Sequence, residues 1–166
     1  AFYHNIRKYD KLNKCLALCN IKIPSQELRL NYISDSEDRI SELILAEDLL
    51  NRVQSNVVFS AGTVTFKLGL KSYEDIAMGI EHLSVFEPLL EEEITDVCDL
   101  DCSIIGLSVS FLSQLPFALF IAKLIKKHNS EIHIVFGGSL FEQNNSEHRY
   151  MSRFSALVDS VICGPG

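Results

Sequence analysis

Small and hydroxyl residues follow three short apolar runs in the last part of the chain. The first run ends in Ser108-Val-Ser110, the second in Gly137-Gly138-Ser139 and the third in Gly164-Pro165-Gly166. Glycine lets a ligand lie directly against the backbone, and serine supplies a hydroxyl group without bulk. A turn alone would explain any one of these glycines, but all three endings together predict a shelf that binds a ligand.

The cysteines are the next residues that could do chemistry. Cys15 and Cys19 are four residues apart, as are Cys98 and Cys102, whereas Cys163 is isolated. Two such pairs could bind zinc, but zinc-binding pairs usually lie on tight turns, and the stretch from Cys15 to Cys19 is typical of a helix interior. The odd total of five cysteines indicates free thiols rather than a disulfide framework. We therefore expect no metal site here.

Histidines and carboxylates provide no catalytic cluster in the sequence. His133 lies inside an apolar run, so we expect a core histidine with a hydrogen-bonded ring nitrogen. His148 stands in a polar stretch and is expected to be solvated. No nucleophile–base pair or pair of carboxylates stands out near the ends of the apolar runs, so no catalytic site is predicted in this chain.

The elements that would position these residues alternate between strand and helix. The runs at 103–110, 132–136 and 158–163 are short and continuous, which is typical of strands covered on both faces. A helix is predicted between the first two, capped by Ser113, with Pro116 in its first turn and basic residues at its end. A short helix is expected around 147–154. This order predicts βαβ units with a parallel sheet, whose ligands bind at the carboxyl ends of the strands.

The first hundred residues are predicted to be mainly helical. Helices are expected over 2–20, after Ser36, and over about 20 residues after the cap at Ser72, with Pro88 disturbing the last one. The segment 51–69 permits two interpretations. Its β-branched and aromatic residues on either side of Ala61-Gly62 favour a hairpin, and an irregular helix junction is the alternative.

Length and charge limit the classes of function. The 166 residues correspond to about one domain, and the net charge of −7 disfavours a nucleic-acid partner. Nine acidic residues against one base between Lys71 and Asp99 predict a solvated helix face. No apolar run is long enough to span a membrane and the start is no signal peptide, so we expect a cytoplasmic protein. Ala1 and the closing Gly-Pro-Gly suggest a piece of a longer chain.

Four segments resemble the cobalamin-binding domain found on the N-terminal side of many radical SAM enzymes, most closely those that mature ribosomally made peptides. They are Asp101-Cys-Ser-Ile-Ile-Gly-Leu-Ser108, the helix from Gln114 to Lys127, Ile134-Val-Phe-Gly-Gly-Ser139, and the final run from Phe154 to Gly166. Ser108-Val-Ser110 takes the place of the Ser-x-Leu of methionine-synthase-type cobalamin folds, with serine in place of leucine, and the paired glycines follow at the family's spacing.

The resemblance implies a Rossmann-like (flavodoxin-like) parallel sheet flanked by helices, a mostly helical N-terminal half, and a corrin ring over the strand ends. The cofactor-binding residues that it implies are Ser108, Ser110, Phe111, Gln114, Gly137, Gly138, Ser139, Gly164 and Gly166. The Asp-x-His-x-x-Gly motif of those folds should lie near 61–66, where neither aspartate nor histidine occurs. That position therefore supplies no lower ligand to cobalt.

The radical SAM cluster motif, Cys-x3-Cys-x2-Cys, is incomplete here, because Lys22 and Ile105 stand where the third cysteine would be. S-adenosylmethionine and an iron–sulfur cluster are therefore expected only in a following domain, with a precursor peptide as a further partner. The resemblance also implies two strands before Ala1. Without them the edge of the strand at 103–110 would be open to the hairpin, another chain or a docked peptide.

The alternative is a degenerate module of the same fold that binds no cofactor and recognises substrate or acts as an interaction scaffold. Bulky Phe111 and Phe141 and the polar stretch at 143–145 are compatible with it, although Phe111 could also be a core residue. A receiver domain would need acidic residues at the strand ends, and a dinucleotide-binding fold would need Gly-x-Gly-x-x-Gly between strand and helix. Neither pattern is present.

Overall fold

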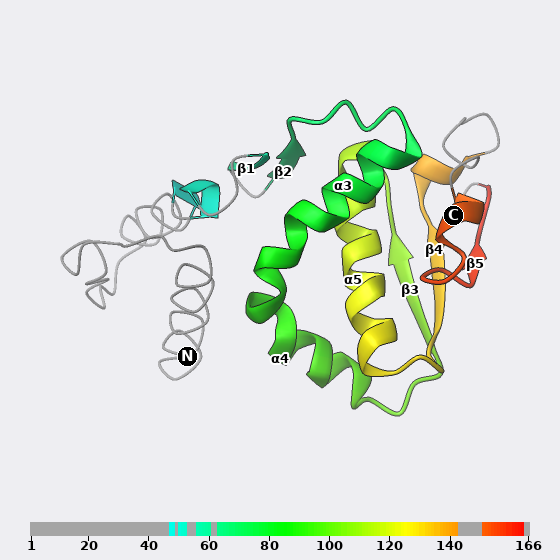
Figure 1. Cartoon of the computed structure of the whole chain (residues 1–166). Helices are drawn as coiled ribbons and strands as arrows, with labels where there is room; N and C mark the ends of the chain where they lie inside the picture. The colour runs from blue at the N-terminus through cyan, green and yellow to red at the C-terminus, as the bar shows by residue number, and fades with distance from the viewer. Residues whose placement is uncertain (1–46, 49, 53–55, 61–62, 143–150, 165–166) are drawn as a thin grey trace, which may run out of the picture.

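The computed structural model describes residues 47–48, 50–52, 56–60, 63–142 and 151–164, which form an α/β chain (Figure 1). Outside the described residues lie the helix expected at 2–20, the first part of the helix expected after Ser36, the pair Cys15 and Cys19, and Gly166. The last part of the helix expected after Ser36 is described, and residues 47–48 and 50–52 are helical. The described elements, in chain order, are β1 (Val57–Ser60), β2 (Thr63–Phe66), α3 (Tyr73–Leu83), η1 (Ser84–Phe86), α4 (Glu87–Cys98), β3 (Ile104–Ser108), η2 (Leu112–Gln114), α5 (Leu115–His128), β4 (His133–Gly137), η3 (Ser139–Phe141), η4 (Ser152–Phe154) and β5 (Ser160–Val161).

The segment that permitted two interpretations is a hairpin. Strands β1 and β2 pair antiparallel, from Val57 opposite Phe66 to Ser60 opposite Thr63. The side chain of Asn51 holds the outer edge of β1, because its Oδ1 accepts the Phe59 N–H at 2.8 Å and its Nδ2 donates to the Phe59 carbonyl at 2.9 Å. The predicted hairpin is therefore confirmed, and the irregular helix junction was the wrong alternative.

The single helix expected after Ser72 is two helices. Ser72 is the N-cap as predicted, since its Oγ accepts the Asp75 N–H at 3.1 Å. However, α3 ends at Leu83, a 3₁₀ turn follows, and Pro88 lies in the first turn of α4. Proline lacks an N–H group, and the first turn of a helix does not need one there. Pro88 therefore marks a new helix start instead of disturbing a longer helix.

Three parallel strands form the second sheet, in the order β3-β4-β5. Ile104 of β3 pairs with His133 and Ser108 with Gly137, while Val135 of β4 pairs with Ser160. Helix α5 connects β3 to β4 and carries Pro116 in its first turn, with three basic residues in its last turn, as predicted. The predicted cap at Ser113 is wrong, because this residue lies inside the 3₁₀ turn η2 that precedes α5.

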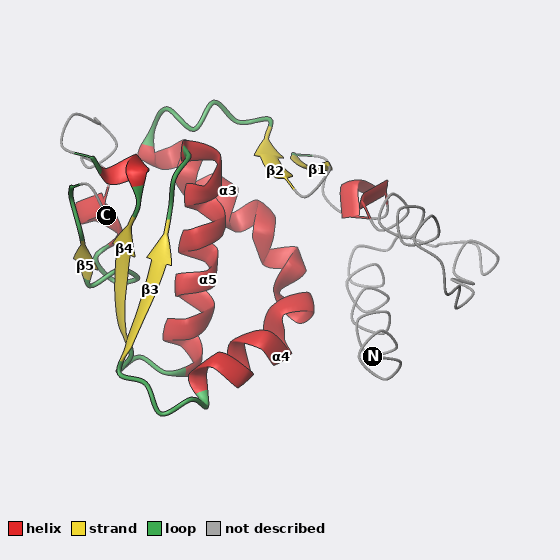
Figure 2. Ribbon diagram, turned by 180° about the vertical axis from the view of Figure 1, so that it is seen from behind, coloured by secondary structure: helices red, strands yellow, loops and turns green. Residues whose placement is uncertain are grey.

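Only one face of this sheet is covered by described elements. Ile134 and Phe136 point into the core, which also contains Leu119 and Phe120 of α5. The alternate residues are open, and Ile104 is 63% exposed. Helices α3, α4 and α5 lie together on one side of the strands, and Figure 2 looks onto the other side, over which no described helix passes. The expectation of strands covered on both faces is therefore wrong for β3.

The prediction that His133 is a core residue is wrong for the same reason. It is not a core residue, because it starts β4 with its side chain on the open face. Its ring nitrogen is nevertheless hydrogen-bonded, as expected, by a contact of 2.8 Å with the hydroxyl of Ser160. The apolar neighbours that suggested a core position point to the opposite face, because side chains alternate along a strand.

Candidate functional site

The carboxyl ends of β3, β4 and β5 lie at one edge of the sheet, because the three strands are parallel. This edge carries all but one of the predicted cofactor-binding residues. We call the following set the strand-end shelf: Ser108, Ser110, Phe111, Gln114, Gly137, Gly138, Ser139 and Gly164. Gly166, the remaining predicted residue, lies outside the described residues.

Backbone contacts close the space between the loops after β3 and β4. The Val109 N–H donates to the Gly137 carbonyl at 2.7 Å, and the Leu140 N–H donates to the Val109 carbonyl at 3.1 Å. The Ser139 hydroxyl adds a hydrogen bond of 3.2 Å to the Ser110 carbonyl. Gly138 has a φ of 104°, and a Cβ there would lie 2.5 Å from the Val109 carbonyl oxygen. Gly138 is therefore required by the packing of two loops against each other.

Gln114 shapes the loop that follows β3. Its Oε1 accepts the N–H groups of Ser110 and Phe111, at 2.9 and 3.2 Å. These two hydrogen bonds stabilise the turn between β3 and η2, and Phe111 in this turn is 66% exposed at the strand-end shelf. The alternative of Phe111 as a core residue is therefore wrong. The amide oxygen of Gln114 is already engaged within the loop.

The shelf fits one part of cobalamin better than the other. The exposed small residues Ser108, Ser110 and Ser139, next to the exposed Phe111 ring, are compatible with a flat corrin lying on this surface. The nucleotide tail needs a slot, and the contact of Gly138 with Val109 fills the space between the two loops. Among the described residues, the fit is therefore to a flat ring face and not to a tail buried between these loops.

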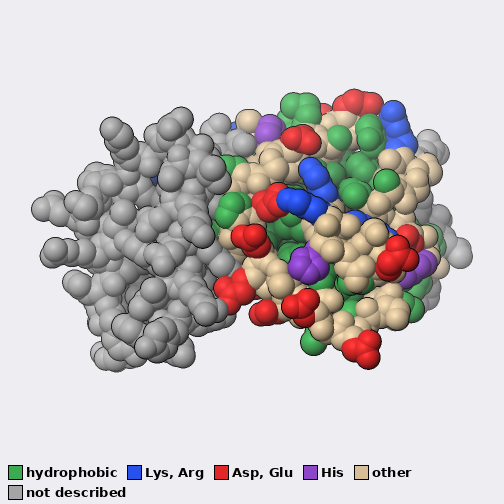
Figure 3. All heavy atoms as spheres, turned by 60° about the horizontal axis from the view of Figure 1, so that its bottom comes forward, with side chains coloured by type: hydrophobic (Ala, Val, Ile, Leu, Met, Phe, Trp, Pro, Cys, Tyr) green, Lys and Arg blue, Asp and Glu red, His purple; other side chains and the backbone are tan. Residues whose placement is uncertain are grey.

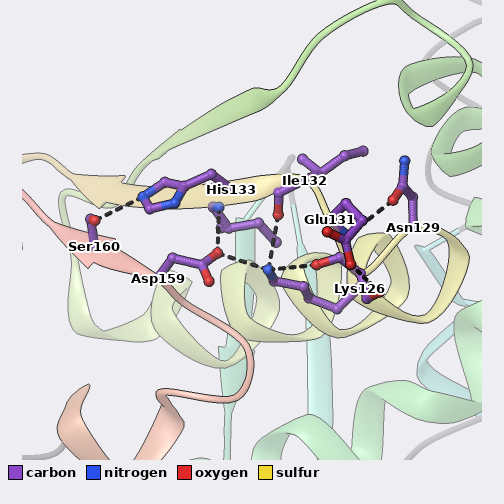
Figure 4. Close-up of polar contacts among 9 residues, drawn as sticks. Lys126, Asn129, Glu131, Ile132, His133, Asp159 and Ser160 are labelled. Carbon is purple, nitrogen blue, oxygen red and sulfur yellow. Dashed lines mark hydrogen bonds and ion pairs between the residues drawn. The ribbon is translucent and has the colours of Figure 1, made fainter.

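A second polar cluster lies at the opposite, amino ends of β4 and β5 (Figure 4). The Asp159 carboxylate accepts the Ile134 N–H at 2.7 Å and pairs with Lys126 of α5 at 2.8 Å. Lys126 also donates to the carbonyls of Ser130 and Ile132. These contacts, first the Ile134 N–H and then Lys126, hold the pKa of Asp159 below its ordinary value. The cluster fixes the start of both strands against α5.

Neither this cluster nor the His133–Ser160 pair beside it is predicted from the sequence. In the sequence Lys126 is one of several basic residues at a helix end, and Asp159 is one residue before a strand. Neither position indicates that the two side chains form an ion pair. The His133–Ser160 pair has the composition of a base and a nucleophile, but the described residues place no carboxylate in hydrogen-bond contact with the imidazole. A catalytic Ser–His pair uses such a group to orient the base. Within the described residues the pair therefore lacks the orienting third member of a catalytic triad.

The environment of the Cys98 thiol disfavours thiolate chemistry. Cys98 ends α4 and is buried, and its burial, followed by the charge of Asp99, raises its pKa. A raised pKa disfavours the reactive thiolate. In the part of the chain that the structure describes, no three His, Cys, Asp or Glu residues gather closely enough to hold a metal ion.

The acidic stretch forms an exposed surface along α4, away from the shelf. Glu91, Glu93 and Asp96 are exposed, which agrees with a solvated helix face, and Figure 3 shows acidic side chains spread over this end of the molecule. Glu87 pairs with Lys127 across to α5. An open hollow of about 270 Å³ lies here, with Ile94 and Leu124 among its lining residues. The described helices include none that is long and apolar enough to cross a membrane.

No known family model, curated protein or solved structure matches this chain.

Proposed function

We propose that the chain is a binding module of the cobalamin-domain type, with the Rossmann-like (flavodoxin-like) sheet and mostly helical N-terminal half that this implies. It would belong to a cytoplasmic radical SAM enzyme that modifies a peptide or small molecule. S-adenosylmethionine and the iron–sulfur cluster would be held by a following domain. We expect no nucleic acid or membrane among its partners.

The observation that carries this proposal is the exposed ring of Phe111 beside three parallel strand ends. An aromatic side chain that is 66% exposed loses the benefit of burial unless a partner covers it. Ser110 and Ser139 keep the surface beside it free of bulky side chains. In this proposal Phe111 contacts the ring edge, and the small residues allow close approach to the backbone. Bound cobalamin would carry a transferred group, while the protein supplies its position and surroundings.

The test is retention of hydroxocobalamin by the purified chain after desalting, read from the visible spectrum. Phe111→Ala is expected to reduce the retained corrin at least about fivefold, because it removes most of an aromatic contact surface. Leu100→Ala is the matched control, since Leu100 is 62% exposed near the other end of β3. It should retain as much corrin as the unaltered chain. If the unaltered chain retains no corrin absorbance, cobalamin binding is excluded.

The degenerate module is the second candidate, and one observation favours it. The side-chain oxygens of Gln114 and Ser139 already bond within the loops, and Gly138 packs against Val109 instead of lining a slot. In this case the same fold would recognise substrate or act as an interaction scaffold. Absence of retained corrin, with an intact fold by circular dichroism, is the result expected for this candidate.

A further inference from the structure

Strand β3 is an edge strand of its sheet, which has the order β3-β4-β5. Among the described residues, no strand therefore pairs with the side of β3 that faces away from β4. The His133 N–H donates to the Ser103 carbonyl at 2.8 Å, and the Val109 N–H donates to the Gly137 carbonyl at 2.7 Å. Successive residues of a strand present their backbone groups to opposite sides. The N–H and C=O groups of Ile104, Gly106 and Ser108 therefore point away from β4, toward the open edge.

This edge lacks the features that normally prevent strand addition. Natural edge strands are usually protected by lysine, proline, a bulge or an overlying element. The strand Ile-Ile-Gly-Leu-Ser contains no charge and no proline, and it pairs with β4 without a bulge. Ile104 is 63% exposed, and a Cβ at Gly106 would meet no atom within 4 Å. Among the described elements, none covers the outer edge of β3 or its second face.

The helices continue past this edge. In Figures 1 and 2, α3 and α4 lie on the side of β3 away from β4. Both helices pack on α5, which itself connects β3 and β4. A strand added to β3 would therefore run alongside the existing helix layer.

We propose that β3 binds an extended peptide segment of another polypeptide, which adds to the sheet as a fourth strand. Another extended backbone can satisfy the whole row of alternating N–H and C=O groups of this edge in place of water, and this is the mode of strand-addition complexes. Asp99 and Asp101 lie exposed just before β3, while β3 itself is uncharged. The segment should therefore carry β-branched residues with Lys or Arg at the end beside these two acids.

A second copy of the chain is the less favoured occupant. The net charge of −7 makes two copies repel, whereas it attracts a basic-ended peptide. The proposal goes beyond the proposed function, because the peptide would pair with backbone groups of β3, Ser108 among them, and requires neither corrin nor any side chain of the strand-end shelf.

Amide hydrogen exchange on the whole chain tests the proposal residue by residue. The probe is a blocked peptide of sequence Lys-Lys-Val-Thr-Val-Thr-Val. The matched control peptide has proline in place of both threonines and of the valine between them, so neither alignment of the peptide offers a row of N–H groups for pairing. With the probe at saturation, exchange at Ile104, Gly106 and Ser108 should slow at least about tenfold. The amides of Ile105 and Leu107 should already be protected without peptide.

Two variants of Gly106 separate edge pairing from general binding. Gly106→Lys adds a positive charge at the edge and should abolish the protection by the probe, whereas Gly106→Ala should keep it. Protection of Ile105 and Leu107 in both variants reports that β3 still pairs with β4. Neither variant should change the retention of hydroxocobalamin, so the outcome is independent of the corrin test.

Three results would overturn the proposal. The first is no slowing at the three edge amides with the probe at millimolar concentration, and the second is equal slowing with the proline peptide. The third is protection of these amides in the chain alone. Such protection would identify a second copy if it disappears on dilution, and a segment of the same chain if it does not.

Discussion

Gly138 determines the form of the strand-end shelf at the scale of a single residue. Its φ of 104° is a conformation that side chains rarely adopt, and the Val109 backbone occupies the position of a Cβ. The glycine pair that suggested a ligand surface therefore serves, at Gly138, to bring two loops together. Gly106 is its opposite, since nothing within 4 Å surrounds the corresponding Cβ position.

Gly138→Ala should lower the free energy of unfolding by roughly 2 kcal/mol or more, from backbone strain together with the clash against Val109. Gly106→Ala, the same change without strain or clash, should leave stability within about 0.5 kcal/mol or raise it. Urea denaturation of both variants measures the difference. Equal loss of stability in the two variants would contradict the tight loop contact.

At the scale of an element, α3 shows how capping sets a helix start. The Ser72 hydroxyl satisfies the Asp75 N–H, one of the donors that a helix start leaves without a helical partner. Tyr73 follows at once and stacks on Phe154, with the Arg153 guanidinium 3.9 Å from its ring centroid. Because the cap also positions this aromatic contact, the start of α3 is tied to the segment before β5.

Ser72→Ala should reduce stability by about 1 kcal/mol, because it leaves a helix-start donor without its partner. Ser84→Ala is the matched control at the other end of α3. There the hydroxyl donates to the Glu81 carbonyl, which water can reach, so the loss should be less than about 0.5 kcal/mol. Thermal unfolding of the two variants compares them, and a loss for Ser84→Ala equal to that of Ser72→Ala would contradict the assignment of the cap.

For the whole molecule, the Asp159–Lys126 pair links the start of β5 to α5 and β4, which lie well before it in the sequence. It joins α5 to the start of β4 and to the residue before β5, and the Asp159 side chain is only 30% exposed. The pKa of Asp159 is lowered by the Ile134 N–H and by Lys126. A carboxyl group with a lowered folded-state pKa adds stability above its ordinary pKa of about 4, and this stability is lost as the pH falls through the folded-state value.

Asp159→Asn should lower stability at pH 7 by about 1–2 kcal/mol, because a charged hydrogen bond and an ion pair are lost. The difference from the unaltered chain should shrink as the pH falls from about 4, where the unfolded-state carboxylate becomes protonated, through the lower folded-state pKa, below which Asp159 is protonated in both states. Urea unfolding across that range measures it. Asp96→Asn, an equal change of charge at an exposed position on α4, is the matched control and should change stability at pH 7 by less than about 0.5 kcal/mol.

Much of the arrangement of elements could be predicted from local signals. The hairpin, the cap at Ser72, and α5 with Pro116 at its start follow from the preferences of a few adjacent residues. The shelf was also predictable as a set, because parallel strands bring their carboxyl ends to one edge. Gln114 could not be assigned in this way. Its Oε1 accepts hydrogen bonds from two loop amides, and this role can be seen only once the conformation of the loop is known.

The sequence by itself determined the class of fold, the succession of strands and helices in the parallel sheet, and the edge of that sheet at which small residues gather. These features depend on capping, proline and side-chain type within a few residues of each other. Only the tertiary structure decided that one face and one edge of β3 are open among the described elements, that His133 is exposed and that Lys126 meets Asp159. The physical reason is that burial and ion pairing depend on which distant segments come into contact, and the residues next to a position in the chain do not specify those contacts.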